Sequence, residues 1–243
     1  MSVSVLTGGE TPFVYSPPVD LSPPVVMSIW AAGVAAGSAV IVGWQIVGPG
    51  YSRLAGSVTL VLGGSAALSG DSPFAWVGCG LAALMIGGAR KQRLALGAGG
   101  AAAIAFGIAV TDANLLGTVS GALFLGGVSS EMMLGHWYLV DPRLPRWALR
   151  RLAVSAGVGA VFDFGVLIGL GVFPWHAGDS AVGIGFIVLV VTTVALMAAV
   201  LGALGEDGYA GVMSATGLSY LALLTAFGSA VVGRLLVAGP VLS

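Results

Sequence analysis

Residues 180–204 read SAVGIGFIVLVVTTVALMAAVLGAL, a run of 25 residues without a charged side chain. A helix crosses the roughly 30 Å hydrocarbon core of a bilayer with about 20 apolar residues. The polar, turn-forming stretches FPWHAGD and GEDG stand before and after the run. This segment therefore predicts a transmembrane α-helix, and the class of the fold follows from it.

The composition extends this prediction to the rest of the chain. Of the 243 residues, 57% are hydrophobic and 8% charged, whereas a soluble domain carries about 25% charged residues. The apolar runs are continuous and do not alternate with polar residues, which disfavours a β-barrel. The 40 glycines suit a membrane bundle because they let helix backbones approach closely. We expect an all-α integral membrane protein, built as a polytopic helix bundle.

Eight stretches are apolar enough to cross a bilayer, and turn-forming residues separate them. The expected spans are residues 25–48, 53–70, 73–89, 93–111, 114–138, 149–173, 180–204 and 208–238. Because the second, third and fourth of these are short, seven spans remain an alternative. We expect residues 1–24 to form a proline-rich arm and residues 25–243 to form a single transmembrane helical domain.

The basic residues indicate how the spans are oriented, because membrane proteins keep Lys and Arg on the cytoplasmic side. With eight spans and the N-terminus outside, eight of the nine basic residues fall at cytoplasmic connections. The exception is Arg234, which we expect to reach the outer interface or to pair with Asp112 or Asp179. The arm of residues 1–24 is then extracytoplasmic, and we expect a multi-pass protein of a bacterial cytoplasmic (inner) membrane.

Two acidic residues fall inside expected spans, where an ionisable group is costly and marks a functional site by default. Asp163 lies near the middle of the span 149–173, in AVFDFGVLIG, and Glu131 lies in the cytoplasmic half of the span 114–138. We interpret both as members of a proton path or of a latch between helices. For Asp163 the plainer alternative is a protonated carboxyl group that bonds to a neighbouring hydroxyl or carbonyl group.

Aromatic and basic residues follow Glu131 in GHWYLVDPRLPRW, residues 135–147. Trp and Tyr gather at membrane interfaces, and basic residues there contact lipid head groups. We expect an interfacial basic patch made of Arg143, Arg146, Arg150 and Arg151. The more specific alternative is a quinone or lipid head-group site formed by His136, Trp137 and Tyr138, in which His136 donates a hydrogen bond to the ligand.

Small residues recur four positions apart in the glycine pairs Gly33–Gly37, Gly117–Gly121 and Gly165–Gly169. This spacing permits two membrane helices to cross closely. Eight spans, an outside N-terminus and the sequence GVAAGSAV (33–40) resemble the membrane anchors of the polysulfide-reductase class, which interact with quinol. The likeness covers topology and a few small residues, and no functional residue is transferred from it.

The net charge, the small number of cysteine and histidine residues and the motifs of the sequence disfavour several classes of function. A net charge of −1 does not indicate a nucleic-acid partner. One cysteine and two histidines leave no Cys-based or His-rich metal site in this chain. We find no phosphate-binding, hydrolase or dinucleotide-binding motif, so we expect neither a catalytic residue nor a metal site.

We therefore expect a non-enzymatic subunit of a larger bacterial energy-converting membrane complex, respiratory or photosynthetic. Its partners would be the lipid bilayer and other membrane subunits. Two alternatives stay open: a stand-alone proton-coupled transporter or channel for a small solute, and a quinone-interacting redox anchor. We expect no intrinsic cofactor, while a quinone, a lipid, or a pigment or haem held by a partner remains open.

Overall fold

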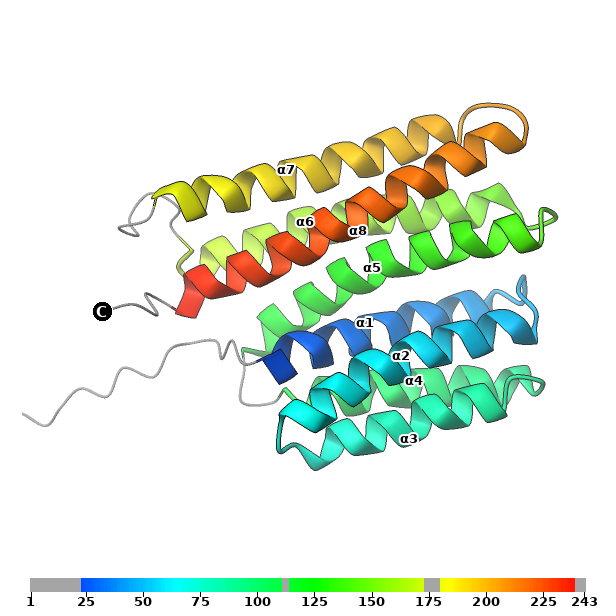
Figure 1. Ribbon diagram of the computed structural model, residues 1–243, viewed down its shortest axis with the longest axis horizontal. Coiled ribbons are helices and arrows are strands. Elements are labelled where there is room, and N and C mark those ends of the chain that lie inside the picture. Colours follow the sequence, from blue (N-terminus) through cyan, green and yellow to red (C-terminus); the bar gives the residue numbers. More distant parts are fainter. Residues whose placement is uncertain (1–22, 111–113, 173–179, 239–243) are drawn as a thin grey trace, which may run out of the picture.

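The computed structural model describes residues 23–110, 114–172 and 180–238, and within these ranges it contains eight α-helices and no strand (Figure 1). The proline-rich arm falls almost wholly outside the described residues. The helices are α1 (Pro23–Gly43), α2 (Pro49–Ser69), α3 (Pro73–Gly87), α4 (Gln92–Ile108), α5 (Leu115–Val140), α6 (Arg146–Gly169), α7 (Ser180–Ala203) and α8 (Tyr209–Ala238). Five of them, α1 and α5–α8, are long and apolar enough to cross a membrane. The all-helical class is thus confirmed.

Proline, asparagine and glycine set several of the helix ends. Pro49 and Pro73 stand in the first turns of α2 and α3, where the N–H that proline lacks has no partner in any case. The side chain of Asn114 caps α5 by accepting hydrogen bonds from two backbone N–H groups of the first turn. Helix α1 ends at Gly43, five residues earlier than expected, and Gln45 just beyond it has a left-handed backbone with φ 59°.

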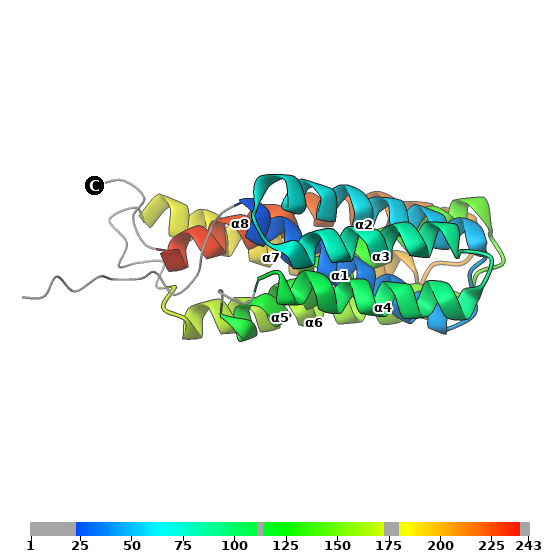
Figure 2. The ribbon, with the colours of Figure 1, turned by 90° about the horizontal axis from the view of Figure 1, so that it is seen from below.

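The eight helices form two similar groups of four. Within each group, every helix packs against its neighbours in the sequence, and α1 also packs against α4 while α5 packs against α8, so that each group closes into a ring. Helices α1 and α5 join the two rings. Figures 1 and 2 show that neighbouring helices run antiparallel along one common axis.

One end of the bundle, which we call the basic end, holds the connections α1–α2, α3–α4, α5–α6 and α7–α8 (right in Figure 1). Eight of the nine basic residues lie in these connections or in the first two turns of the following helix. They are Arg53, Arg90, Lys91, Arg93, Arg143, Arg146, Arg150 and Arg151. The opposite end holds the start of α1 and the last turns of α6 and α8. Arg234 belongs to this opposite end.

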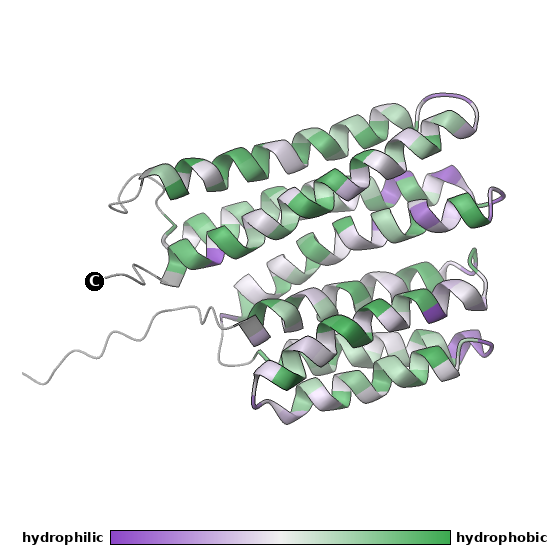
Figure 3. Ribbon diagram, in the orientation of Figure 1, coloured by the Kyte–Doolittle hydropathy of each residue, from purple (hydrophilic) through white to green (hydrophobic). Residues whose placement is uncertain are grey.

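Hydrophobic residues predominate along the helices (Figure 3), and many large apolar side chains among them are exposed. Leu68, Leu115 and Leu224 are 79%, 76% and 70% exposed. Contiguous exposed apolar surface marks contact with a membrane or with another protein. The sides of the helices therefore have the chemistry of a surface that faces lipid or neighbouring helices.

Helices α1 and α5 approach most closely where Gly33 faces Gly126. A Cβ atom on Gly33 would overlap the carbonyl oxygen of Ala122 and lie 2.8 Å from the backbone nitrogen of Gly126. One turn further along, Gly37 leaves the space that the Ser130 hydroxyl group occupies. The Gly33–Gly37 pair thus lies at a close helix crossing, as its spacing permits.

Candidate functional site

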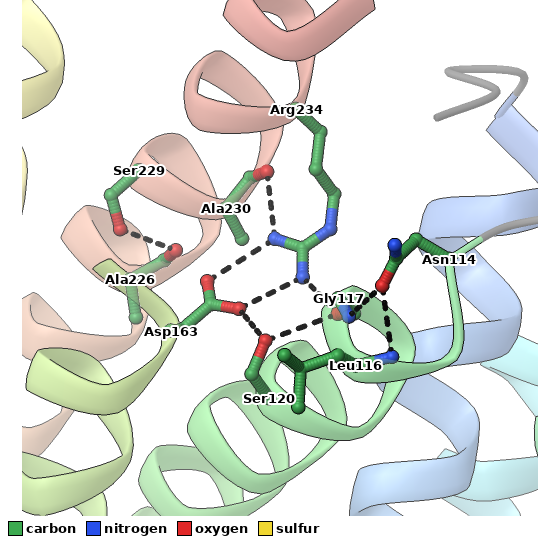
Figure 4. A network of polar contacts seen from close by, with 9 residues as sticks. All are labelled: Asn114, Leu116, Gly117, Ser120, Asp163, Ala226, Ser229, Ala230 and Arg234. Atoms are coloured by element: carbon green, nitrogen blue, oxygen red, sulfur yellow. Dashed lines mark hydrogen bonds and ion pairs between the residues drawn. The ribbon is translucent and has the colours of Figure 1, made fainter. Parts of the chain in front are cut away.

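A buried ion pair joins α6 to α8 near the opposite end (Figure 4). Oδ1 of Asp163 lies 3.0 Å from Nη2 of Arg234, and Oδ2 lies 3.3 Å from Nη1. Asp163 is 2% exposed and Arg234 is 1% exposed. Two parallel contacts between a guanidinium and a carboxylate make the strongest form of ion pair, because both charges are hydrogen-bonded twice.

Helix α5 supplies the rest of this site. Ser120 Oγ donates a hydrogen bond of 2.6 Å to Oδ1 of Asp163, and Nη2 of Arg234 donates one of 2.8 Å to the Gly117 carbonyl oxygen. Gly121 provides the space, since a Cβ atom there would overlap the guanidinium group. The contacts join three helices, and the hydrogen bonds compensate part of the cost of burying two charges. We call Ser120, Asp163, Arg234 and the Gly117 carbonyl the ion-pair site.

The partner of Arg234 differs from the expected one. Asp112 and Asp179 lie outside the described residues, and the side chain of Arg234 turns inward onto Asp163 instead of reaching the interface. Asp163 also lies six residues before the end of α6, about halfway between the middle of the helix and the opposite end. Since Arg234 lies four residues before the end of α8, both are within about 9 Å of helix ends that share one face. A comparison of the distances of Asp163 and Arg234 from the ends of their helices could therefore have predicted this ion pair from the sequence.

Glu131 has a very different environment. Its side chain is fully buried in α5, and neither carboxyl oxygen has a hydrogen-bond partner among the described residues. The Ser219 hydroxyl of α8 lies beside it but donates its hydrogen bond of 2.8 Å to the Ala215 carbonyl. Burying a polar group without a hydrogen-bond partner destabilises the folded state. Its retention in the core therefore points to a role other than packing.

Further buried hydroxyl groups without a partner gather in the same half of the bundle. In the part of the chain that the structure describes, these belong to Ser38 and Tyr51, which lie beside each other, and to Ser130, with Thr118 a fourth near the opposite end. Tyr51, Ser38 and Glu131 lie two, five and nine residues from the basic ends of their helices. These separations correspond to about 3, 8 and 14 Å along the helix axes. Polar groups thus occur at increasing depth from the basic end.

The structure keeps the two buried acids apart. On α5, Glu131 is eleven residues from Ser120, the hydroxyl donor to Asp163. Eleven residues of α-helix extend about 16 Å. The two acids therefore form two sites, one fully paired and one without a partner in the described chain.

His136, Trp137 and Tyr138 lie on different sides of α5 and do not surround one space. A hydrogen bond of 3.1 Å joins Nδ1 of His136 to the Tyr220 hydroxyl of α8. Trp137 packs edge-on against Tyr51 of α2, with ring centres 6.2 Å apart, and Tyr138 is buried in the core. Successive helical residues point about 100° apart, which explains the three directions.

The four arginines of the expected basic patch divide into two pairs. Arg146 donates hydrogen bonds to the carbonyl groups of Glu206 and Gly208, and Arg150 donates one of 3.0 Å to the Leu204 carbonyl. These contacts hold the connection after α7, whose terminal carbonyl groups attract positive charge. The side chains of the other two, Arg143 and Arg151, donate no hydrogen bond within the described ranges.

Arg151 is held by an aromatic ring instead. Its guanidinium carbon lies 4.8 Å from the ring centre of Trp147, and Trp44 of α1 packs against the same ring at 5.2 Å. A cation over the face of an indole ring is favourable, and it leaves the N–H groups of the guanidinium available to a further partner.

The polar groups described above do not form a metal centre: among the described residues, no three His, Cys, Asp or Glu side chains are grouped as metal ligands. No protein-family model, no curated protein and no solved structure matches the chain. The function is therefore argued from the contacts of these residues alone.

Proposed function

We propose that the chain is a non-catalytic, multi-pass subunit of a larger bacterial energy-converting complex, respiratory or photosynthetic, in the cytoplasmic membrane. The observation that carries the proposal is the length of the connections. No connection between successive helices is longer than ten residues. Segments this short do not fold into a catalytic domain, so the proposal assigns no catalytic role to the connections.

In this proposal all eight helices span the bilayer, with the N-terminus outside and the basic end in the cytoplasm. The positive-inside rule supports this orientation. Helices α3 and α4, with 15 and 17 residues, are about 22 and 26 Å long and are shorter than the average hydrocarbon core. A locally thinner bilayer accommodates such short spans at modest cost.

The two buried acids take separate roles in the proposal. The ion-pair site is a latch that fixes α6 and α8 against α5, because both carboxylate oxygens of Asp163 and both terminal nitrogens of Arg234 are bonded. Glu131 is the group that carries a proton, because its carboxyl oxygens have no partner in the described chain. The hydroxyl groups of Tyr51 and Ser38 support a path to it from the basic end.

The test of the subunit proposal is a purification in mild detergent from the native host, with the tagged chain expressed from its own promoter. We expect companion membrane proteins to co-purify in fixed proportion and to be identified by mass spectrometry. A stable preparation of this chain alone would overturn the subunit proposal. It would favour the transporter alternative, which predicts proton flux in vesicles reconstituted with the purified chain.

The test of the proton path compares Glu131→Gln with Glu131→Asp in the purified assembly. Gln has nearly the same shape as Glu but carries no ionisable proton, so we expect proton uptake to be lost. Asp retains the carboxyl group, and we expect partial uptake. Equal uptake by the unmodified protein and by Glu131→Gln would remove Glu131 from the path.

The quinone-anchor alternative is favoured by one contact, the hydrogen bond between His136 and Tyr220. Both side chains are exposed at the basic half of the α5–α8 interface, and Tyr220 is 44% exposed. A hydroxyl group and an imidazole ring are suitable donors to a quinone carbonyl. This alternative predicts quinone in the purified protein and a lower quinone content in His136→Ala.

A further inference from the structure

We propose that a groove between the two helix rings binds the acyl chain of an anionic phospholipid, with the head group held by Arg151. The groove has a volume of about 720 Å³ and is lined by α1, α4, α5 and α6. This inference concerns a lipid site and does not depend on the subunit proposal.

Glycine residues shape the floor of the groove. Gly33 and Gly37 of α1 and Gly126 of α5 line it where the two helices cross. Ile104 of α4 and Phe162 of α6 line it as well, and these side chains are 65% and 41% exposed. A floor without side chains and walls of apolar side chains fit a flexible hydrocarbon chain.

The basic end of the groove carries a cation suited to a phosphate. Arg151 lines the groove, is exposed, and lies over the Trp147 ring. The neighbouring arginines, Arg146 and Arg150, donate hydrogen bonds to backbone carbonyl groups. Among the described residues, the guanidinium of Arg151 donates no hydrogen bond, so its N–H groups are available to a ligand in the groove. Trp44 also lines the groove, and tryptophan is enriched at the level of lipid head groups. Basic pockets between helices on the cytoplasmic side bind anionic head groups.

A second polar group inside the groove points to a ligand with hydrogen-bonding atoms. Ser130 lines the groove and is fully buried, and its hydroxyl has no partner within the described residues. A phospholipid offers ester carbonyl oxygens below its phosphate, which can accept a hydrogen bond from such a hydroxyl group. A purely hydrocarbon ligand would leave this group unpaired.

The lining residues indicate where a phospholipid would lie in the groove. Those on α6 run from Arg151, near the basic end, to Phe162, a distance of about 16 Å along the helix. Thr118 of α5 extends the lining further, toward the opposite end. One leaflet contributes about half of the roughly 30 Å hydrocarbon core, so a phospholipid whose head group lies at Arg151 fills the part of the groove nearest the basic end.

The experiment is native mass spectrometry of the full chain, purified in mild detergent, delipidated and titrated with dioleoylphosphatidylglycerol or dioleoylphosphatidylcholine. We expect one phosphatidylglycerol to be retained under conditions that remove phosphatidylcholine. Arg151→Gln should lower that occupancy about fivefold, since one basic residue at an anionic head group contributes roughly that factor. Arg143→Gln, an exposed arginine outside the groove, should leave it unchanged.

A second pair of variants tests the groove itself. Ala36 lines the groove and is exposed, so Ala36→Phe should fill it and lower the occupancy of phosphatidylglycerol. Ala198→Phe, at an exposed position on α7, is the matched control. Equal retention of both lipids, or equal effects of Arg151→Gln and Arg143→Gln, would overturn the proposal. So would a second protein chain that occupies the groove and excludes lipid.

Discussion

Single residues show how differently two buried acids can be accommodated in one bundle. Asp163 receives hydrogen bonds from Arg234 and Ser120, whereas both oxygens of Glu131 lack a partner in the described chain. Breaking a buried ion pair leaves an uncompensated charge, and removing a buried group without a partner relieves a cost. The two acids should therefore respond to substitution in opposite directions.

Substitution at the ion-pair site should strongly destabilise the protein. Asp163→Asn leaves the guanidinium of Arg234 buried without its counter-charge, and we expect a loss of about 3–5 kcal/mol. The double variant Asp163→Leu with Arg234→Met removes both charges and should recover most of that loss. Thermal unfolding in mild detergent measures both effects, with Asp141→Asn at an exposed position as the control. A double variant as unstable as the single one would show that the charges do not act as a pair.

Substitution of Glu131 should stabilise the protein. Glu131→Met replaces two carboxyl oxygens that have no partner by an apolar side chain of similar length, and we expect a gain of about 1–3 kcal/mol. The same change at the exposed Glu206 should alter stability by less than about 0.5 kcal/mol. The unfolding assay used for Asp163 measures both. A loss of stability in Glu131→Met would mean that the carboxyl group is bonded in the native protein. A gain accompanied by lost proton uptake would fit a group retained for function.

At the scale of helices, glycine spacing alone does not identify a crossing. Gly33 and Gly37 lie against α5, and Gly121 makes room for Arg234. Gly165 and Gly169, which have the same spacing, have no atom of the described residues within 4 Å of the position of a Cβ. This third pair therefore does not lie at a close crossing between described helices, although its spacing would permit one.

This difference predicts that a glycine-to-alanine substitution changes the stability of the protein in different ways at Gly33 and at Gly165. Gly33→Ala places a methyl group against the backbone of α5, which cannot move aside, and we expect a loss of about 1–3 kcal/mol. Gly165→Ala meets open space, and its better helix propensity should leave stability unchanged or raise it by up to about 1 kcal/mol. Thermal unfolding of the two variants side by side is the measurement. Equal losses at both positions would contradict the assignment of the crossing.

At the scale of the whole molecule, two rings of four helices share one pattern of connections. An even number of antiparallel helices places the start of α1 and the end of α8 at the same end (Figure 1). Contacts between the rings of helices centre on α1. The Trp30 indole N–H of α1 donates a hydrogen bond of 2.8 Å to the Ser129 hydroxyl of α5, and the indole ring centre lies 4.9 Å from the ring centre of Phe227 in α8. The antiparallel order of the helices places eight of the nine basic residues at one end.

Cysteine labelling checks the orientation of the molecule. The chain has one cysteine, the buried Cys79, which can be replaced by alanine to give an unreactive background. We expect a membrane-impermeant maleimide to label Asp71→Cys in intact spheroplasts, because Asp71 lies in the α2–α3 connection at the opposite end. Arg90→Cys and Arg143→Cys should react only after permeabilisation. Labelling of these two positions from different sides of the membrane would contradict the shared basic end.

The amino-acid sequence by itself determined the helical class, the approximate helix ranges and the position of the basic residues. These depend on local composition, because a chain in lipid must satisfy its backbone hydrogen bonds within each segment. An acid in an apolar run is equally visible, so Asp163 and Glu131 were both identifiable. Helix α1 ends earlier than the sequence predicted, because the backbone of Gln45 is left-handed. Hydropathy contains no information about such a backbone conformation.

Only the tertiary structure decided what each buried group contacts. Asp163 meets Arg234, 71 residues away in the sequence, and Glu131 meets no partner in the described chain. Such pairing depends on the rotation and depth of each helix. These helices expose large apolar side chains as well as burying them, so hydrophobic periodicity does not specify a rotation. Close backbone contact at glycine and a few polar bonds set the rotation instead, and both exist only once the helices have packed.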